Sequence, residues 1–262
     1  MNSITMPLLA SDEPAAVEEY RPAGPSPFLL VCDHAGRRVP RSVKLGIAEA
    51  DLARHIGWDI GIAGVGRKLA DRLDAALIMQ PYSRLVIDCN RRPGVASSIS
   101  KVSEVTTIPG NESVSEGEAA ARVGEIFAPY HDTITRRLEE RDNAGRKTIL
   151  VALHSFTPVF GGIPRPWHCG LLYNRYRGLA APLLDMLRAD TSLVVGDNEP
   201  YSVTDDTDYT IPVHGEQRGL VHVAIEIRHD LIAADAGQTE WAERLADLLP
   251  KAAAAAVAVR PN

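Results

Sequence analysis

Two histidines in this chain of 262 residues stand at the ends of apolar runs. Residues 151–153, Val-Ala-Leu, lead to His154 and then to Ser-Phe-Thr-Pro, and residues 28–33 lead to His34. Such runs are typical of buried strands, and α/β enzymes bind ligands beyond the carboxyl ends of their strands. Imidazole nitrogens are common zinc ligands, so the pair indicates a metal site if the fold brings the two segments together. The alternative is that each is a core histidine bonded to backbone.

A third run, residues 221–228, carries Glu226 between two isoleucines. An ionised carboxylate inside a strand costs several kcal/mol unless it is paired or lies at a metal. Glu226 is therefore either the partner of an arginine such as Arg84 or Arg228, or a general base that takes a proton from water at a metal. The sequence leaves both possibilities open.

Arginines bracket residues 85–89, with Arg84 before them and Arg91 after Asn90. A guanidinium group binds a carboxylate through two hydrogen bonds and can stabilise an oxyanion. This segment is thus a candidate for binding an anionic substrate, although a solvated strand edge would show the same pattern.

Apolar, β-branched runs alternate with helical patterns along the chain, which predicts an α/β fold. Helices are expected over residues 60–73, over 115–141 with a capping box at Ser115 and a kink or break at Pro129, and in a tail from residue 238 that packs on the sheet. Two long polar connections, residues 91–110 and 198–219, are expected to form walls of an active site. The predicted strands are residues 28–32, 76–79, 85–89, 148–153, 171–173, 193–195 and 221–227.

Composition limits the class of protein. With 45% hydrophobic and 24% charged residues the chain is an ordinary globular protein, and a net charge of −6 argues against nucleic acid as a partner. Residues 1–27 hold five prolines and show little apolar periodicity, which predicts a flexible arm before a single domain over residues 28–262.

Location is predicted from what the sequence lacks. No run reaches the roughly 18 apolar residues of a membrane span, and residues 1–27 do not have the pattern of a signal peptide. Cys32, Cys89 and Cys169 are far apart and lie beside apolar residues, so they are expected to be buried free thiols in a reducing compartment. A soluble cytoplasmic protein is expected, and its oligomeric state is left open.

Several of these segments together resemble the N-formylglutamate amidohydrolase family over residues 28–230. The resemblance rests on the His34 strand end, the Glu226 strand and three segments: 55–61 (His-Ile-Gly-Trp-Asp-Ile-Gly), 82–91 (Tyr-Ser-Arg-Leu-Val-Ile-Asp-Cys-Asn-Arg) and 154–158 (His-Ser-Phe-Thr-Pro). The Gly-Trp-Asp-Ile-Gly part indicates a divergent branch. That family is similar in architecture to zinc carboxypeptidases and aspartoacylases, which implies three α/β/α layers with a central mixed, largely parallel sheet.

The resemblance also implies roles for the residues. It makes His34 and His154 ligands of one Zn²⁺ ion and Glu226 the general base. It makes Arg84 a contact for the oxyanion or a carboxylate, and Asn90 with Arg91 the anchors of a substrate carboxylate.

The third metal ligand departs from the carboxypeptidase pattern, because a His-x-x-Glu motif is absent and Arg37 stands where its glutamate would be. Asp59 is expected to take that place, because it belongs to a family-like segment before a helix. The alternative is that Asp59 only caps the helix that follows it. The rival ligands are Asp33, His55 and Asp88.

In the second long loop, His214 and Arg218 are expected to contact the substrate, because they lead into the Glu226 strand. The expected reaction is zinc-dependent hydrolysis of the amide bond in a small acidic N-acyl amino acid such as N-formyl-L-glutamate, which releases formate and the amino acid. Two alternatives remain: a metallopeptidase or amidase acting on a longer acylated or peptidoglycan-like substrate, and a non-catalytic carboxylate-binding module that has lost the metal.

Overall fold

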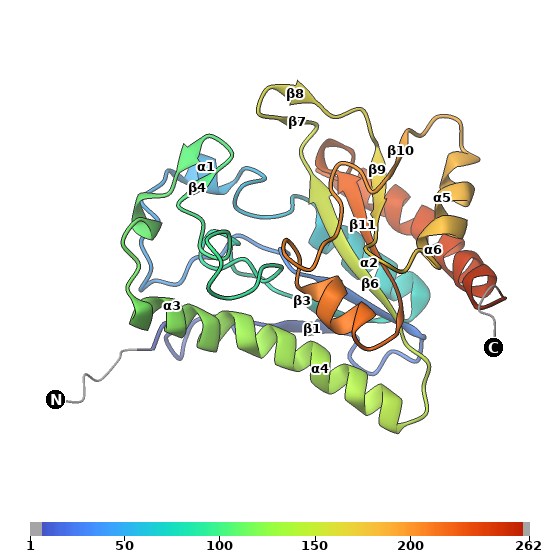
Figure 1. Cartoon of the computed structure of the whole chain (residues 1–262), viewed down its shortest axis with the longest axis horizontal. Coiled ribbons are helices and arrows are strands. Elements are labelled where there is room, and N and C mark those ends of the chain that lie inside the picture. The colour runs from blue at the N-terminus through green and yellow to red at the C-terminus, as the bar shows by residue number, and fades with distance from the viewer. Residues whose placement is uncertain (1–6, 259–262) are drawn as a thin grey trace.

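A seven-stranded mixed sheet forms the centre of the computed structural model, which describes residues 7–258 (Figure 1). Strands β3, β2, β6 and β11 run parallel to one another, and β1 and β9 run antiparallel to β3 and β11 at either side. Across the sheet the order is β1 (Glu18–Tyr20), β3 (Ala76–Met79), β2 (Phe28–Cys32), β6 (Ile149–Phe156), β11 (Val221–Arg228), β9 (Cys169–Leu172) and β10 (Val195–Asp197).

Helices cover both faces of the sheet because its central strands are apolar on both sides. In β2, Leu30 and Cys32 pack toward one helical layer, and Leu29 and Val31 pack toward the other. The first layer holds α2 (Ile62–Leu73), α5 (Ala180–Arg188) and α6 (Asp235–Ala258). The second holds α3 (Glu116–Arg122), the π turn η2 (Val123–Phe127), α4 (Ala128–Asn143) and a further π turn, η3 (Ile211–Glu216). The predicted three-layer fold is confirmed.

The helix expected from Ser115 begins with the predicted capping box, in which the Ser115 hydroxyl accepts from the amide of Glu118 and the Glu118 carboxylate accepts from the amide of Ser115. The π turn η2 separates α3 from α4, and Pro129 stands in the first turn of α4, where its missing N–H costs no helical hydrogen bond. The expected kink or break therefore takes the form of the π turn η2, just before Pro129.

The strand predicted at residues 85–89 is wrong. Leu85, Val86 and Ile87 are buried, but residues 84–86 form a turn and none of the three pairs with a described strand. The amide of Val86 donates to Ser83, and the amide of Asp88 donates to Ser98. The apolar run thus reflects burial under the polar loop that follows it.

The loose arm predicted for residues 1–27 is also wrong from Leu8 onward, and residues 1–6 lie outside the described part of the chain. Strand β1 extends the sheet at its edge by pairing with β3. Leu8 and Ala16 are buried against the second helical layer, and the amides of Leu8 and Leu9 donate to the Glu125 carboxylate. These contacts could not be predicted, because the segment is rich in proline and shows no apolar periodicity.

The loops beyond the sheet contain several short elements. They are α1 (Glu49–Leu52), the hairpin of β4 (Val102–Ser103) and β5 (Thr106–Thr107), the 3₁₀ turn η1 (Pro109–Asn111), the hairpin of β7 (Val159–Phe160) and β8 (Ile163–Pro164), and the 3₁₀ turn η4 (His229–Leu231). Between residues 7 and 258, no helix is long and apolar enough to cross a membrane.

Candidate active site

A cavity of about 450 Å³ opens beyond the carboxyl ends of β2, β6 and β11. Both long connections contribute to its walls, as expected, through residues such as Ser97 and Ser100 from the first and Tyr201 and Asp208 from the second. The structure brings seven predicted site residues to this one cavity: His34, Asp59, Arg84, Asn90, Arg91, His154 and Glu226.

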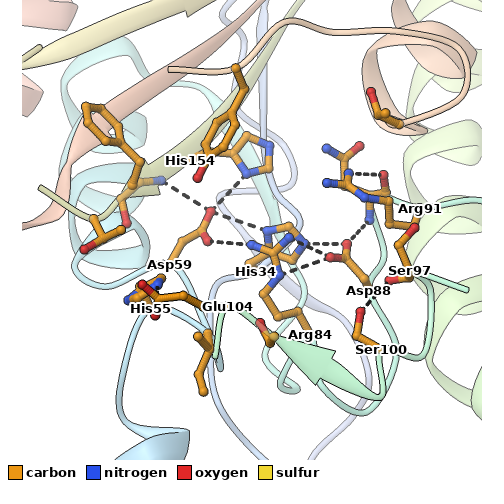
Figure 2. A pocket seen from close by; sticks show the side chains of 18 of the residues that line it. His34, His55, Asp59, Arg84, Asp88, Arg91, Ser97, Ser100, Glu104 and His154 are labelled. Atoms are coloured by element: carbon orange, nitrogen blue, oxygen red, sulfur yellow. Dashed lines mark hydrogen bonds and ion pairs between the residues drawn. The ribbon is translucent and has the colours of Figure 1, made fainter. Parts of the chain in front are cut away.

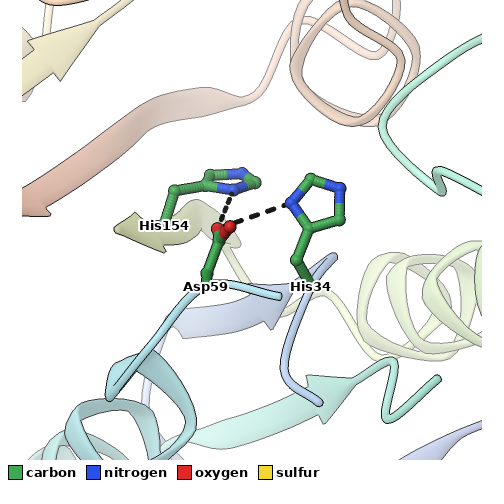
Figure 3. A group of neighbouring side chains, drawn as sticks. All are labelled: His34, Asp59 and His154. Carbon is green, nitrogen blue, oxygen red and sulfur yellow. Dashed lines mark hydrogen bonds and ion pairs between the residues drawn. The ribbon is translucent and has the colours of Figure 1, made fainter. Parts of the chain in front are cut away.

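His34, Asp59 and His154 form a compact buried group (Figure 3). Asp59 Oδ2 lies 3.4 Å from His34 Nδ1 and 3.0 Å from His154 Nδ1, and one ligand atom from each residue lies within 4.8 Å of the others. The Asp59 amide donates to the His34 carbonyl, which ties the loop before α2 to the end of β2. Asp59 is not a helix cap, because Gly61 occupies the N-cap of α2 without any side-chain cap.

The outer nitrogen of each histidine faces a further carboxylate. His34 Nε2 lies 2.7 Å from Asp88 Oδ1, and His154 Nε2 lies 3.2 Å from Asp33 Oδ2. For His34, an Nε2–H that donates to Asp88 leaves the Nδ1 lone pair pointing inward, as a histidine that binds a metal requires. Two imidazole nitrogens and a carboxylate oxygen within 4.8 Å of one another fit a single divalent ion such as Zn²⁺. Asp33 and Asp88, rivals for the third ligand, stand behind the rings.

The carboxylates of the group set the charge state of its histidines. Burial lowers the pKa of His154, but Asp33 and Asp59 outweigh it and hold that pKa well above its ordinary value. For His34, burial and Arg84 act downward, while Asp88 and Asp59 raise the net pKa. Burial acts to raise the pKa of Asp59, but the interactions with His34 and His154 are stronger and lower that pKa. The site therefore concentrates negative charge that a cation would neutralise.

Glu226 lies beside this group without an ion pair among the described residues. It is 7% exposed, it stands opposite His154 in the β6–β11 ladder, and its Oε2 is buried without a hydrogen-bond partner. Arg84 and Arg228, which the sequence offered as partners, bind other carboxylates. Burial raises the pKa of Glu226 to about 7, which is the range of a general base that works near neutral pH.

Arg84 is held in place from two sides. Its Nε and Nη2 donate to Asp88 Oδ2 at 3.0 and 2.6 Å, and its Nη1 lies 3.5 Å from Asp59 Oδ1. Arg84 thus connects the carboxylate behind His34 with the carboxylate between the two histidines (Figure 2).

Asn90 and Arg91 differ in how many donors they leave for a ligand. Asn90 Oδ1 accepts from the amides of Tyr209 and Thr210, and its Nδ2 donates to Asp208, so this side chain holds the second long loop in place. Arg91 Nη1 donates to the Asn90 carbonyl, while its other donors make no hydrogen bond to residues 7–258.

His214 and Arg218 do not reach the cavity, contrary to the prediction. The π turn η3 directs His214 into the second helical layer, where its Nε2 lies 2.9 Å from Nδ1 of His131. Arg218 extends toward Glu139 on α4, at 3.9 Å. A position just before the Glu226 strand in sequence is the amino end of β11, whereas the cavity lies at its carboxyl end.

The buried pair of His131 and His214 has a defined protonation. His131 Nε2 lies 2.7 Å from the Cys89 carbonyl, which can only accept, so His131 donates there and accepts from His214 Nε2–H through its Nδ1. Burial lowers the pKa of His131 to about 4 and that of His214 to about 3. Both rings are therefore neutral at neutral pH.

Replacing His214 with glutamine tests this assignment. The folded-state pKa lies below the unfolded value, so the stabilisation is present above about pH 6.5 and is lost as the pH falls toward the folded value. The difference in unfolding free energy between wild type and His214→Gln should fall by about 2 kcal/mol between about pH 7.5 and pH 5, as measured in urea. A difference that does not change with pH would contradict a neutral buried His214.

Several lining residues have no distinct signal in the sequence. Glu104, Phe160 and Asp208 lie in loops or hairpins, and their neighbours in sequence are equally polar or apolar. His55, a rival metal ligand, lines the cavity beside Glu104, with its Nε2 at 3.3 Å from that carboxylate. The long loops could be predicted to form walls, but not which of their side chains face inward.

Comparison with known proteins gives a consistent result. The model of a family described as N-formylglutamate amidohydrolase matches residues 26–233. A solved structure of a gene product from Agrobacterium tumefaciens is 38% identical with a TM-score of 0.91, covering 94% of this chain and 98% of that one. An N-formylglutamate amidohydrolase from Ralstonia eutropha is 18% identical with a TM-score of 0.69, covering 94% and 100%, and it shares the fold. None of the curated proteins matches the chain.

Proposed function

Because the chain belongs to the N-formylglutamate amidohydrolase family, we propose that it hydrolyses the amide bond of a small N-acyl amino acid, with one zinc ion as its cofactor. The observation that supports this most strongly is the position of Glu226, a buried carboxyl group without a salt bridge, beside the His34, Asp59 and His154 group. Family membership makes N-formyl-L-glutamate the first substrate to test.

His34 Nδ1, Asp59 and His154 Nδ1 would hold the ion. The hydrogen bond to Asp88 keeps the His34 ring in the required tautomer, and Asp33 lies 3.2 Å from His154 Nε2. When bound, zinc supplies a Lewis acid that polarises the amide carbonyl and lowers the pKa of water.

Glu226 moves the proton. It accepts a proton from the attacking water and returns it to the amine nitrogen as the carbon–nitrogen bond breaks, which yields the free acid and the free amine. A pKa of about 7 suits both directions of this transfer. Because Glu226 is buried, few bulk waters compete for that proton.

The cationic side chains orient the substrate. We assign Arg84 to the developing oxyanion, because it lines the cavity beside Asp59 and is fixed by Asp88. Arg91 anchors the substrate carboxylate with its unused donors. Asn90 contributes by holding the loop around Asp208 and Thr210.

Metal dependence can be measured directly. Amine release from N-formyl-L-glutamate should occur with zinc-loaded protein, stop after treatment with a chelator, and return when zinc is added back. Turnover that survives complete removal of the metal would exclude a metal-dependent reaction. The intact set of donor atoms supports an enzyme over a binding module that has lost its metal.

A further inference from the structure

The cavity has two unlike halves, one on each side of the His34, Asp59 and His154 group. Figure 2 shows Arg91, Ser97 and Ser100 on one side of His34, and His55 and Glu104 on the other. A substrate whose amide lies at Glu226 must extend into both halves, with the acyl group in one and the amine portion in the other.

The first half can hold one carboxylate. Of the described side chains that line the cavity, five are carboxylates and two are guanidinium groups. Arg84 is already paired with Asp88 and Asp59, whereas Arg91 lies 3.8 Å from Asp208 through Nη1 and keeps Nε and Nη2 without a hydrogen bond to residues 7–258. A second substrate carboxylate would find no further cation among the lining side chains, and it would lie near carboxylates that repel it.

The second half is aromatic. Phe160, on the β7–β8 hairpin, packs against His55 with ring centroids 6.4 Å apart. Arg165 stacks on the rings of Phe160 and Tyr201, at 4.6 and 4.7 Å, and also donates to the Tyr201 hydroxyl. This arrangement fixes both rings at the mouth of the cavity, although Phe160 is 40% and Tyr201 42% exposed. Exposed aromatic side chains held in place are typical of surfaces that a ligand covers.

Charge in this half is neutralised. Arg54 Nη2 donates to Glu104 Oε2 at 2.7 Å, and the other oxygen of Glu104 accepts from the amide of Gly161. Burial lowers the pKa of His55, which favours its neutral form. Among the described residues that line the cavity, the half around Phe160 therefore offers apolar surface and no cation; Arg165, which is not part of the lining, lies against the two rings and donates to the Tyr201 hydroxyl.

We propose that the two halves select an N-acyl amino acid with a single carboxylate, bound by Arg91, and with an apolar acyl group larger than formyl, bound against Phe160 and Tyr201. The orientation follows from the scissile bond, because the carboxylate belongs to the amine portion and the acyl group lies on the other side of that bond. This inference rests on the proposed amide hydrolysis and narrows its substrate.

Five substrates test the two halves separately. With zinc-loaded protein, kcat/KM for N-hexanoylglycine should exceed that for N-acetylglycine at least tenfold, because only the length of the acyl chain differs. N-acetyl-L-glutamate should be no better than N-acetylglycine, and N-formyl-L-glutamate no better than N-formylglycine, because the second carboxylate finds no cation. A clear preference for either glutamate would overturn the inference while leaving the proposed hydrolysis intact.

The Phe160→Ala variant tests where the acyl group binds. It should lower kcat/KM for N-hexanoylglycine about tenfold more than for N-acetylglycine. Ile163→Ala is the matched control, because Ile163 lies on the same hairpin, is 71% exposed and does not line the cavity; it should leave the ratio unchanged. Equal losses on both substrates in Phe160→Ala would overturn the assignment.

Equilibrium binding separates the inference from the reaction. Zinc-loaded Glu226→Gln protein should bind N-hexanoylglycine at least tenfold more tightly than N-acetyl-L-glutamate by calorimetry, and Phe160→Ala added to it should remove most of that preference. If the variants show these affinities but the wild-type protein turns over none of the substrates, the proposed hydrolysis is refuted and the two binding halves are supported. Equal or reversed affinities would refute the halves themselves.

Discussion

Replacing Glu226 with glutamine is expected to reduce turnover by at least about 100-fold, the lower end of what a general base contributes. The amide keeps the shape of the side chain but cannot accept the proton from water. Nothing in the described structure would take over, because Glu226 is the carboxyl group of the cavity that is buried without a partner. The measurement is kcat for amine release, with zinc content determined on the same samples.

Zinc content should stay close to one ion per chain in Glu226→Gln, because the glutamate is not among the three donors. Glu104→Gln is the matched control: it also removes a carboxylate from the cavity wall, but one that is paired with Arg54. Its effect on kcat should be much smaller. Wild-type turnover by Glu226→Gln would refute the assigned role, and loss of zinc would mean that the glutamate is itself a ligand.

The edge of the sheet that holds the site could be predicted from the sequence, but the strand order could not. Parallel strands end at the same edge of a sheet, so His34 after β2, His154 in β6 and Glu226 in β11 could be placed at one edge once the three runs were read as strands, and the adjacent order β2, β6, β11 brings them together. Asp59 needed the family resemblance, because an aspartate before a helix is more often a cap.

Contacts made across loops could not be predicted in the same way. Asp33 and Asp88 were candidate metal ligands in the sequence, and only the direction of their side chains shows that they face the outer nitrogens of His154 and His34. His214 stands near β11 in sequence but at its far end in space. Sequence distance says nothing about which end of a strand a loop approaches.

The apolar run at residues 85–89 shows a second limit. Periodicity reports burial, and these residues are buried without belonging to the sheet. Their turns place Arg84 and Asp88 so that Arg84 donates to Asp88, and this pair supports His34. A regular strand would send residues four apart to the same face but extend them too far for that contact.

Asp59→Asn should cost the protein most of its metal. The asparagine amide keeps an oxygen but lacks the negative charge that Asp59 places beside both histidines, so it cannot neutralise part of the charge of a divalent cation. Affinity for zinc should fall at least about 100-fold, which is the upper end of what a supporting carboxylate contributes. Competition with a chromogenic chelator measures it, and kcat/KM at limiting zinc should fall in parallel.

A graded series makes the result specific. Asp88→Asn removes the carboxylate behind His34 and should weaken zinc binding by about 10- to 100-fold, since the ring loses the partner that fixes its tautomer. Asp208→Asn removes a lining carboxylate that hydrogen-bonds Asn90, and it should leave zinc affinity unchanged. If Asp88→Asn proved more damaging than Asp59→Asn, Asp88 would be the third ligand, and His34 would have to bind the ion through Nε2, the ring nitrogen that faces Asp88, in place of Nδ1.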